Sequence, residues 1–219
     1  NFLFTLDKVA TTDITITYII HSGTATAGKD ITDGSLDTVV KVVIPAGANG
    51  FVVPVNIVQD SGVEGNETFN IELLTADGAT LGKRTAEVTI VDDDITIKPE
   101  ANTVDESDGL GSEHSVTGSL GVDYKGSGTT PVVTLSNKDA TWDEANHTLS
   151  NQYWKAVVDF DANGLPTGTY TFTQLEAMSH SNKANPNDAL SINITATVTT
   201  SVVVNGVTTT STATAPILI

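Results

Sequence analysis

Apolar and polar residues alternate along much of this chain. Ile14, Ile16 and Tyr18 alternate with threonines near its start. The same two-residue period recurs at 51–57, 69–73 and 86–90. A period of two is typical of strands that are buried on one face. No window of about 11 residues carries the apolar spacing and caps of an amphipathic helix. The pattern therefore predicts an all-β protein.

The second half of the chain has the same character. Strand-like runs cover 132–135, 153–160, 169–173 and 190–198. Residues 202–209 predict a hairpin, because Asn205-Gly206 tolerates the two positive φ angles of a type I′ turn between β-branched residues. The polar segment 175–188 contains Pro186 and carries only weak signals for a short helical turn.

Turn-forming residues separate these runs, as at Ser22-Gly23, 45–50, Asp77-Gly78 and Leu81-Gly82. Short strands with regular turns predict a β-sandwich or a barrel. With 219 residues the chain has room for one large or two ordinary domains. After Asp94, residues 95–100 indicate a connector that becomes the first strand of a second domain. We therefore expect two tandem antiparallel β-sandwiches, at 1–94 and 95–219.

Composition narrows the possible partners. The chain has 10 basic and 27 acidic residues, a net charge of -17, and no cysteine. This charge argues against nucleic acid and anionic membranes as partners, since both require a basic face. No apolar stretch reaches the roughly 20 residues of a membrane span, so we expect no direct membrane insertion. Without disulfides, a bound metal is the more natural staple for a secreted β-domain.

Acidic residues gather where strand-like runs end. Asp92-Asp93-Asp94 follow the run 86–91, and no lysine or arginine stands beside them. The loop 60–67 is also acidic, and Asp30 lies in another turn. If the strands before Asp60 and Asp92 run the same way, up to seven carboxylates share one end of the sandwich. These predicted ligands are Asp30, Asp60, Glu64, Glu67, Asp92, Asp93 and Asp94.

Clustered carboxylates repel one another unless a cation lies between them. Ca²⁺ is the hard cation that such oxygen ligands suit best, and it takes six to eight oxygens, some of them from water and backbone. Seven carboxylates exceed the need of one ion, so the sequence favours two or more Ca²⁺ ions that share ligands.

Residues 1–94 resemble the Calx-β domain, a Ca²⁺-binding sandwich of sodium–calcium exchangers, integrins and large bacterial adhesins. The matching stretches are 23–30, 43–47, 60–69, 78–82 and 88–94. The resemblance implies a ligand role for the same seven acidic residues. Gln59 replaces an acidic residue of the best Ca²⁺ binders, which implies fewer ions or weaker affinity. The family's first strand, which carries a ligating Glu, has no counterpart here, so we expect that it was cut away or comes from elsewhere.

Residues 95–219 resemble the repeat domains of giant type I-secreted bacterial adhesins of the RTX class. The matching stretches are 103–107, 167–172 and 189–199. The usual Asp-x-Asp-Gly is replaced by Thr200-Ser201, so a Ca²⁺ site there is not expected. The resemblance implies an immunoglobulin- or cadherin-like sandwich on the bacterial cell surface. The implied partners are neighbouring domains of the same adhesin and a glycan or protein on a target surface.

Other chemical motifs in the second half have simpler interpretations. Asp105, Glu106 and Asp108 fit either an ion site at the joint between the domains or a polar turn. Residues 159–164 begin like an EF-hand loop, but Tyr170 stands where the bidentate Glu belongs, which favours a turn after a strand. The four histidines lack metal-ligand spacing, and Trp142 and Trp154 fit core positions better than a sugar platform.

Catalysis finds little support in the sequence. A nucleophile elbow, a zinc-protease motif and a phosphate loop are all absent. Paired carboxylates occur in glycosidases, but clusters in loops at a sandwich end suit metal better. We therefore expect no enzyme. The leading hypothesis is a Ca²⁺-stabilised structural segment of a large adhesin that supports cell adhesion or biofilm formation. A module that recognises a glycan, peptide or protein is the alternative, and a regulatory Ca²⁺ sensor is a weaker one.

Overall fold

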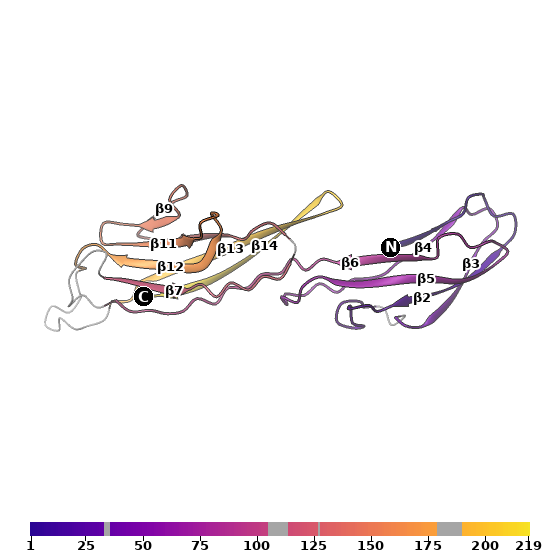
Figure 1. Cartoon of the computed structure of the whole chain (residues 1–219), viewed down its shortest axis with the longest axis horizontal. Helices are drawn as coiled ribbons and strands as arrows, with labels where there is room; N and C mark the ends of the chain where they lie inside the picture. The colour runs from indigo at the N-terminus through magenta and orange to yellow at the C-terminus, as the bar shows by residue number, and fades with distance from the viewer. Residues whose placement is uncertain (33–35, 105–113, 127, 179–189) are drawn as a thin grey trace. The chain divides into compact units, whose positions relative to one another are not determined.

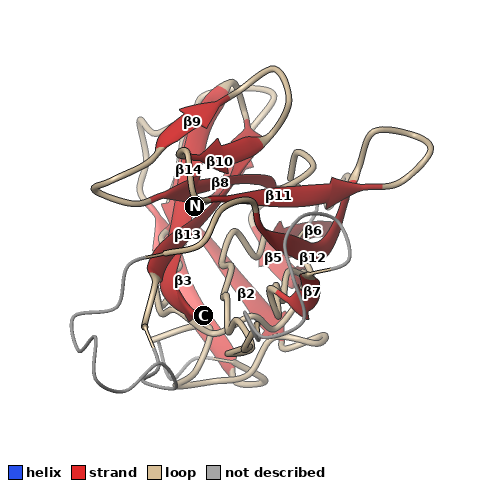
Figure 2. Cartoon of the chain, turned by 90° about the vertical axis from the view of Figure 1, so that its left-hand side faces the viewer, coloured by secondary structure: helices blue, strands red, loops and turns tan. Residues whose placement is uncertain are grey.

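Strands build all of the regular structure that the computed structural model describes. The described residues are 1–32, 36–104, 114–126, 128–178 and 190–219. They contain fourteen strands joined by loops and no helix, as Figure 2 shows. A helix long and apolar enough to cross a membrane is accordingly not found among them. The prediction of an all-β, sandwich-type protein is confirmed.

Contacts divide the chain into two compact units, residues 1–61 with 65–92, and residues 62–64 with 93–219. The strands of the first unit are β1 (Phe2–Thr5), β2 (Ile14–His21), β3 (Val39–Ile44), β4 (Gly50–Val53), β5 (Glu67–Asp77) and β6 (Thr85–Ile90). The strands of the second are β7 (Ser115–Ser119), β8 (Val132–Ser136), β9 (Thr141–Asp143), β10 (Thr148–Ser150), β11 (Trp154–Phe160), β12 (Pro166–Gln174), β13 (Asn193–Val204) and β14 (Val207–Leu218). Figure 1 labels most of them.

The first unit has two sheets around a common core. A four-stranded antiparallel sheet has the order β3-β2-β5-β6, and β1 pairs with β4 in a second, smaller sheet. Along β2, every second side chain is buried, from Ile14 to Ile20. Phe2 of β1 meets Phe69 of β5 with ring centroids 5.7 Å apart at 89°. Because these rings come from different sheets, their edge-on contact joins the two layers into a sandwich.

One predicted strand of this unit is shorter than expected. The alternation at 51–57 predicted a strand to Ile57, but β4 ends at Val53. Pro54 follows directly, and proline lacks the backbone N–H that the next ladder bond would need. Ile57 instead forms an isolated bridge with Ile31. β3 was not among the strands predicted from alternation. Its last two residues belong to the stretch 43–47, which carries the resemblance to the Calx-β domain.

The second unit also has two sheets. Five strands follow the order β7-β12-β11-β10-β9, and three follow β14-β13-β8. Tyr170 and Phe172 of β12 are fully buried in the same cluster as Ile194 and Ala196 of β13. Trp154 is only 3% exposed and stacks on Phe172 with centroids 5.6 Å apart. The expectation that Trp154 is a core residue is therefore confirmed.

The predicted hairpin is present and longer than expected. Asn205 and Gly206 have φ of 51° and 78°, as a type I′ turn requires. Val204 pairs with Val207, and the ladder continues to Asn193 opposite Leu218. The strand predicted from residue 190 therefore begins at Asn193 and runs to Val204.

Of two connecting segments, one differs from its prediction and the other agrees with it. Residues 95–100 were expected to become a strand, but they hold only an isolated bridge between Thr96 and Asp123. Residues 159–164 form a turn after a strand, as predicted, because the Asp161 carboxylate accepts from the N–H groups of Asn163 and Leu165. Asp105, Glu106 and Asp108, and most of the segment 175–188, lie outside the described residues.

Candidate metal centre

Three of the predicted ligands come together around one point. Asp30, Glu64 and Glu67 each offer a carboxylate oxygen, and these oxygens all lie within 4.8 Å of one another. Asp30 is buried at 4% exposure, Glu67 is half-buried and Glu64 is exposed. Within the described ranges, this is the one group of three or more metal-ligating side chains at such spacing.

The loop that carries Asp30 is fastened to the start of β5. Gly23 has φ of 57°, and a Cβ there would lie 2.3 Å from the carbonyl oxygen of Thr68. Only glycine can therefore pass so close. The N–H groups of Thr24 and Ala25 both donate to that same oxygen, each at 3.0 Å. Glu67 precedes Thr68, so these bonds bring the Asp30 loop beside Glu67.

Apolar side chains and local hydrogen bonds then orient Asp30. Ala25 and Ile31 flank the turn and are buried in the core at 2% and 0% exposure. The Thr26 N–H donates to Asp30 Oδ2 at 2.7 Å, and the Asp30 N–H donates back to the Thr26 carbonyl at 3.0 Å. This reciprocal pair holds the carboxylate in a defined position beside the core.

The pairing of β5 with β6 positions the acidic loop before β5. Glu67 pairs with Ile90, so two residues further along Asp92 comes opposite Gly65. The Gly65 N–H donates to Asp92 Oδ2 at 2.6 Å, and the Asp92 N–H donates to Asn66 Oδ1 at 3.0 Å. These bonds fix the chain immediately after Glu64. The roles of Thr26 and Asn66 were not predicted from the sequence. The available signal was that each lies in a turn that also carries an acidic residue.

The other four predicted ligands lie outside the three-residue group. Asp92 is hydrogen-bonded to Gly65 next to it, whereas Asp60 is exposed and Asp93 and Asp94 are half-buried. Successive side chains of an extended backbone point in opposite directions, so adjacent aspartates do not all face one ion. A ligand role for Asp60, Asp92, Asp93 and Asp94 stays a prediction.

The three-residue group fits a calcium ion. Calcium–oxygen bonds of 2.3–2.6 Å allow two ligands of one ion to be up to about 4.6–5.2 Å apart, so oxygens that lie within 4.8 Å of one another can share one ion. All three donors are carboxylate oxygens, which hard cations prefer over the nitrogen and sulfur ligands typical of zinc. A divalent cation would also offset the negative charge of Asp30, which is buried at 4% exposure.

Three carboxylates of the second unit accept hydrogen bonds from residues of their own turns or of a neighbouring strand. A hydrogen bond from the Asn146 side chain is the main cause of a lowered pKa at Asp143, and backbone N–H groups of Leu165 and Asn163 lower the pKa of Asp161. Asp159 accepts from the hydroxyls of Thr169 and Thr171. These carboxylates already have donors from their own turns and strands, so they do not gather into a metal group.

An oxygen-only group on loops between sandwich strands is the arrangement expected of a calcium-binding β-domain. Residues 4–94 match the model of the Calx-beta domain family. Calx-beta domains bind calcium, and the match contains all seven predicted ligands. The resemblance inferred from motifs is therefore confirmed for this part of the chain.

Two solved structures of calcium-binding domains are also similar to the chain. The calcium binding domain CBD12 of CALX1.1 has 17% identity and a TM-score of 0.37, with 89% of this chain and 69% of that one covered. CBD12 from CALX1.2 has 18% identity and a TM-score of 0.38, with 90% and 71% covered. Similarity at this level does not align individual residues. No curated protein matches the chain.

Proposed function

We propose that this chain is a Ca²⁺-stabilised structural segment of a large bacterial surface adhesin, where it supports cell adhesion or biofilm formation. The observation that carries the calcium part is the convergence of Asp30, Glu64 and Glu67 inside a Calx-beta match. The resemblance of residues 95–219 to adhesin repeats supports the cell-surface part. Neighbouring domains of the same adhesin are the proposed partners.

Calcium would act by joining loops that are distant in sequence. Asp30 belongs to the turn after β2, whereas Glu64 and Glu67 belong to the segment that enters β5. An ion bound to all three would restrain both segments and neutralise their mutual repulsion. Binding to the folded state alone adds RT ln(1 + [L]/Kd), about 2.7 kcal/mol at 100 times Kd. Extracellular calcium modules bind at roughly 10⁻⁴–10⁻³ M, so external calcium would keep such a segment rigid.

The buried tryptophan supports a structural role over recognition through that side chain. Trp154 is 3% exposed and stacks in the core, so it offers no indole face to a ligand. Trp142 is half-buried, and its Nε1–H donates to Glu144 Oε2 at 2.7 Å. A structural segment needs stable sandwiches and no catalytic constellation, and that the chain is not an enzyme stays a prediction.

Thermal unfolding and isothermal titration calorimetry test the calcium part. We expect Ca²⁺ to bind with release or uptake of heat and to raise the unfolding midpoint, and we expect excess chelator to reverse the shift. Mg²⁺ at the same concentration is the control, because its smaller octahedral shell suits this loop group less well. An unfolding midpoint that is the same in saturating Ca²⁺ and in chelator would refute calcium stabilisation.

Cell-surface labelling tests the adhesin part. Antibodies raised against this chain should label intact cells of the source bacterium, and deletion of the coding segment should reduce surface attachment. Labelling that appears only after cells are permeabilised would contradict the proposed location.

A further inference from the structure

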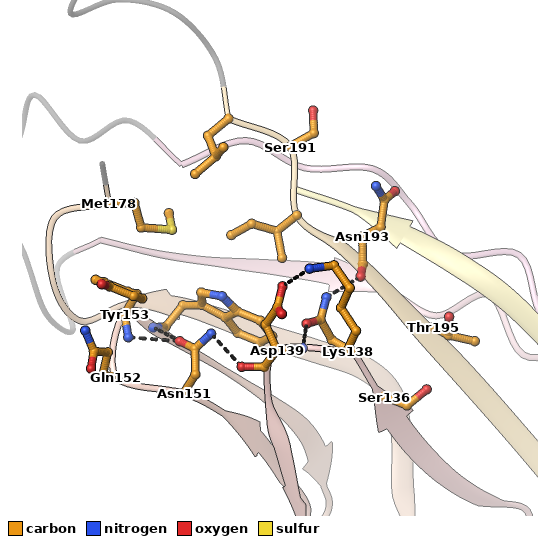
Figure 3. A pocket seen from close by; sticks show the side chains of 14 residues that line it. Ser136, Lys138, Asp139, Asn151, Gln152, Tyr153, Met178, Ser191, Asn193 and Thr195 are labelled. Carbon is orange, nitrogen blue, oxygen red and sulfur yellow. Dashed lines mark hydrogen bonds and ion pairs between the residues drawn. The ribbon is translucent and has the colours of Figure 1, made fainter. Parts of the chain in front are cut away.

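The second unit contains a cavity whose lining includes none of the residues of the acidic group. It has a volume of about 990 Å³ and is lined by fourteen residues. The turn between β8 and β9 forms one wall, the turn between β10 and β11 forms another, and the chain entering β13 closes a third side. Figure 3 shows Lys138, Asp139, Asn151 and Tyr153 among the side chains that line it. The volume falls in the range of small-molecule sites.

The lining mixes polar and apolar groups and carries no net charge. Eight of the fourteen residues have uncharged amide or hydroxyl side chains, and the two charged ones, Lys138 and Asp139, form an ion pair with each other. Small-molecule pockets are usually lined by apolar groups with only a few polar ones. A cavity this rich in amides and hydroxyls suits a ligand that is itself neutral and rich in hydrogen-bonding groups.

Internal hydrogen bonds hold the walls in place. Asn151 Oδ1 accepts from the N–H groups of Tyr153 at 2.9 Å and Trp154 at 3.1 Å. The Asn151 amide also donates to the Asp139 carbonyl at 3.3 Å, which ties the two turns together. Asn137 donates to the Asn193 carbonyl at 2.6 Å and fastens the third side. These bonds order the two turns and the chain entering β13 before any ligand arrives, which lowers the ordering cost of binding.

Other polar side chains of the lining remain available. The structure records hydrogen bonds from the side chains of Asn137 and Asn151 to the walls. It records none between described residues for the side chains of Gln152, Ser191 and Asn193. A primary amide presents two donor hydrogens and an acceptor oxygen, which matches the alternating donors and acceptors of adjacent hydroxyl groups.

An exposed aromatic ring stands beside these polar groups. Tyr153 is 38% exposed and is the one aromatic residue among the exposed large hydrophobic residues of the described chain. Trp154, its neighbour, is anchored in the core, so the backbone under Tyr153 is rigid. A flat ring with a polar tip offers an apolar face and a hydroxyl to the same ligand.

We propose that this cavity is a binding site for a neutral saccharide, with Tyr153 stacking on the C–H face of a sugar ring and polar side chains of the lining, Gln152 beside Tyr153 among them, bonding its hydroxyls. A sugar combines the two features that the lining offers, an apolar ring face and many neutral hydroxyls. This inference goes beyond the proposed calcium function and rests on residues of the second unit alone.

Glycan-array binding and saturation-transfer NMR with the full chain test the proposal. The probes are neutral mono- and oligosaccharides built from glucose, galactose, mannose and N-acetylglucosamine. We expect binding in chelator as well as in Ca²⁺, with a dissociation constant near 1 mM for the best monosaccharide, a typical weak affinity of about 4 kcal/mol. Because binding in chelator is measured separately, failure of the calcium proposal and failure of this one can be told apart.

Matched variants locate the site. Tyr153→Ala should weaken saccharide binding about tenfold or more, and Gln152→Ala should weaken it less. Leu165→Ala is the control, because Leu165 is similarly exposed at 44% and lies outside the cavity lining. All three variants should keep the wild-type response to Ca²⁺. An array without any neutral glycan bound, binding of peptides only, or equal binding by Tyr153→Ala and wild type would each overturn the proposal.

Discussion

The two halves of the chain carry almost the same charge and use it in different ways. Residues 1–94 have five basic and fourteen acidic residues, a net charge of −9, and residues 95–219 have five and thirteen, a net charge of −8. In the first half, loops from different strands bring Asp30, Glu64 and Glu67 together. In the second half, Asp143 and Asp161 are capped by donors within their own turns.

This difference shows that acidic composition alone does not predict a metal site. A carboxylate whose turn supplies several N–H donors is already stabilised as an anion. Carboxylates gathered from distant segments repel each other, so we expect a cation to stabilise the group. The comparison therefore predicts that the stability of the first half depends on calcium, whereas the stability of the second half depends on local hydrogen bonds and not on calcium.

Calcium removal should have the largest effect, and only on the first half. Loss of about 2.7 kcal/mol of ligand-linked stability would lower its unfolding midpoint by roughly 10–20 °C for a domain of this size. Hydrogen-exchange mass spectrometry locates the effect. Chelator should raise exchange in the loops 22–32 and 60–67 and leave β11 and β12 unchanged. Equal loss of protection in both halves would remove the distinction between them.

The effect of Asp30→Asn on the free energy of unfolding should change sign between Ca²⁺ and chelator. In Ca²⁺ the variant should lose most of the ion-linked stability, on the order of 2 kcal/mol. In chelator it should be as stable as the wild type or more stable, because one of three clustered charges is gone while the amide oxygen can still accept from Thr26. Thermal unfolding in both conditions measures the effect.

Asp77→Asn is the matched control for that variant. Asp77 is an exposed aspartate at the end of β5 in the same half and does not belong to the three-residue group. Its unfolding midpoints in Ca²⁺ and in chelator should both stay close to those of the wild type. If Asp77→Asn reproduces the sign reversal, general charge and not the Asp30 group is responsible.

Tyr170→Phe should destabilise the second half regardless of calcium. The Tyr170 hydroxyl donates to the Glu100 carbonyl at 3.0 Å and accepts from Asn102 Nδ2 at 2.8 Å, and the side chain is fully buried. Its removal leaves two polar groups without that partner, which costs about 1–3 kcal/mol. Urea unfolding should show the same loss in Ca²⁺ and in chelator. A loss that depends on calcium would contradict the separation of the two halves.

Asp161→Asn should have the smallest effect on stability, and that effect should fade in acid. Backbone N–H donors lower the pKa of Asp161 in the folded state below its ordinary value of 3.8. A lowered folded pKa contributes stability that is present above the ordinary pKa and is lost as the pH falls through the folded value. The stability difference between wild type and Asp161→Asn should therefore be constant above about pH 5 and shrink below 3.8. Urea titrations across that range measure it, and a constant difference at every pH would contradict the role of these donors.

Much of the strand content could be predicted from alternation, but strand ends often could not. The register of β2 is visible in its sequence because every second residue is apolar and buried. The short strands β9 and β10 have too few residues to show a period. In β3, exposed and half-buried positions alternate, but valines occupy both kinds, so the sequence shows no apolar–polar alternation. Their pairing depends on neighbours supplied by other parts of the chain.

The sequence by itself determined the all-β class, the type I′ hairpin at Asn205-Gly206, and the acidic loops, because each follows from local chemistry within a few residues. Only the tertiary structure decided which acids meet. Asp30 reaches Glu67 because two N–H groups bond Thr68, and Glu64 is held nearby because β5 pairs with β6 in one register. The cavity of the second unit arises in the same way from turns more than ten residues apart in sequence. Such convergence depends on long-range pairing and packing, which no local pattern of residues specifies.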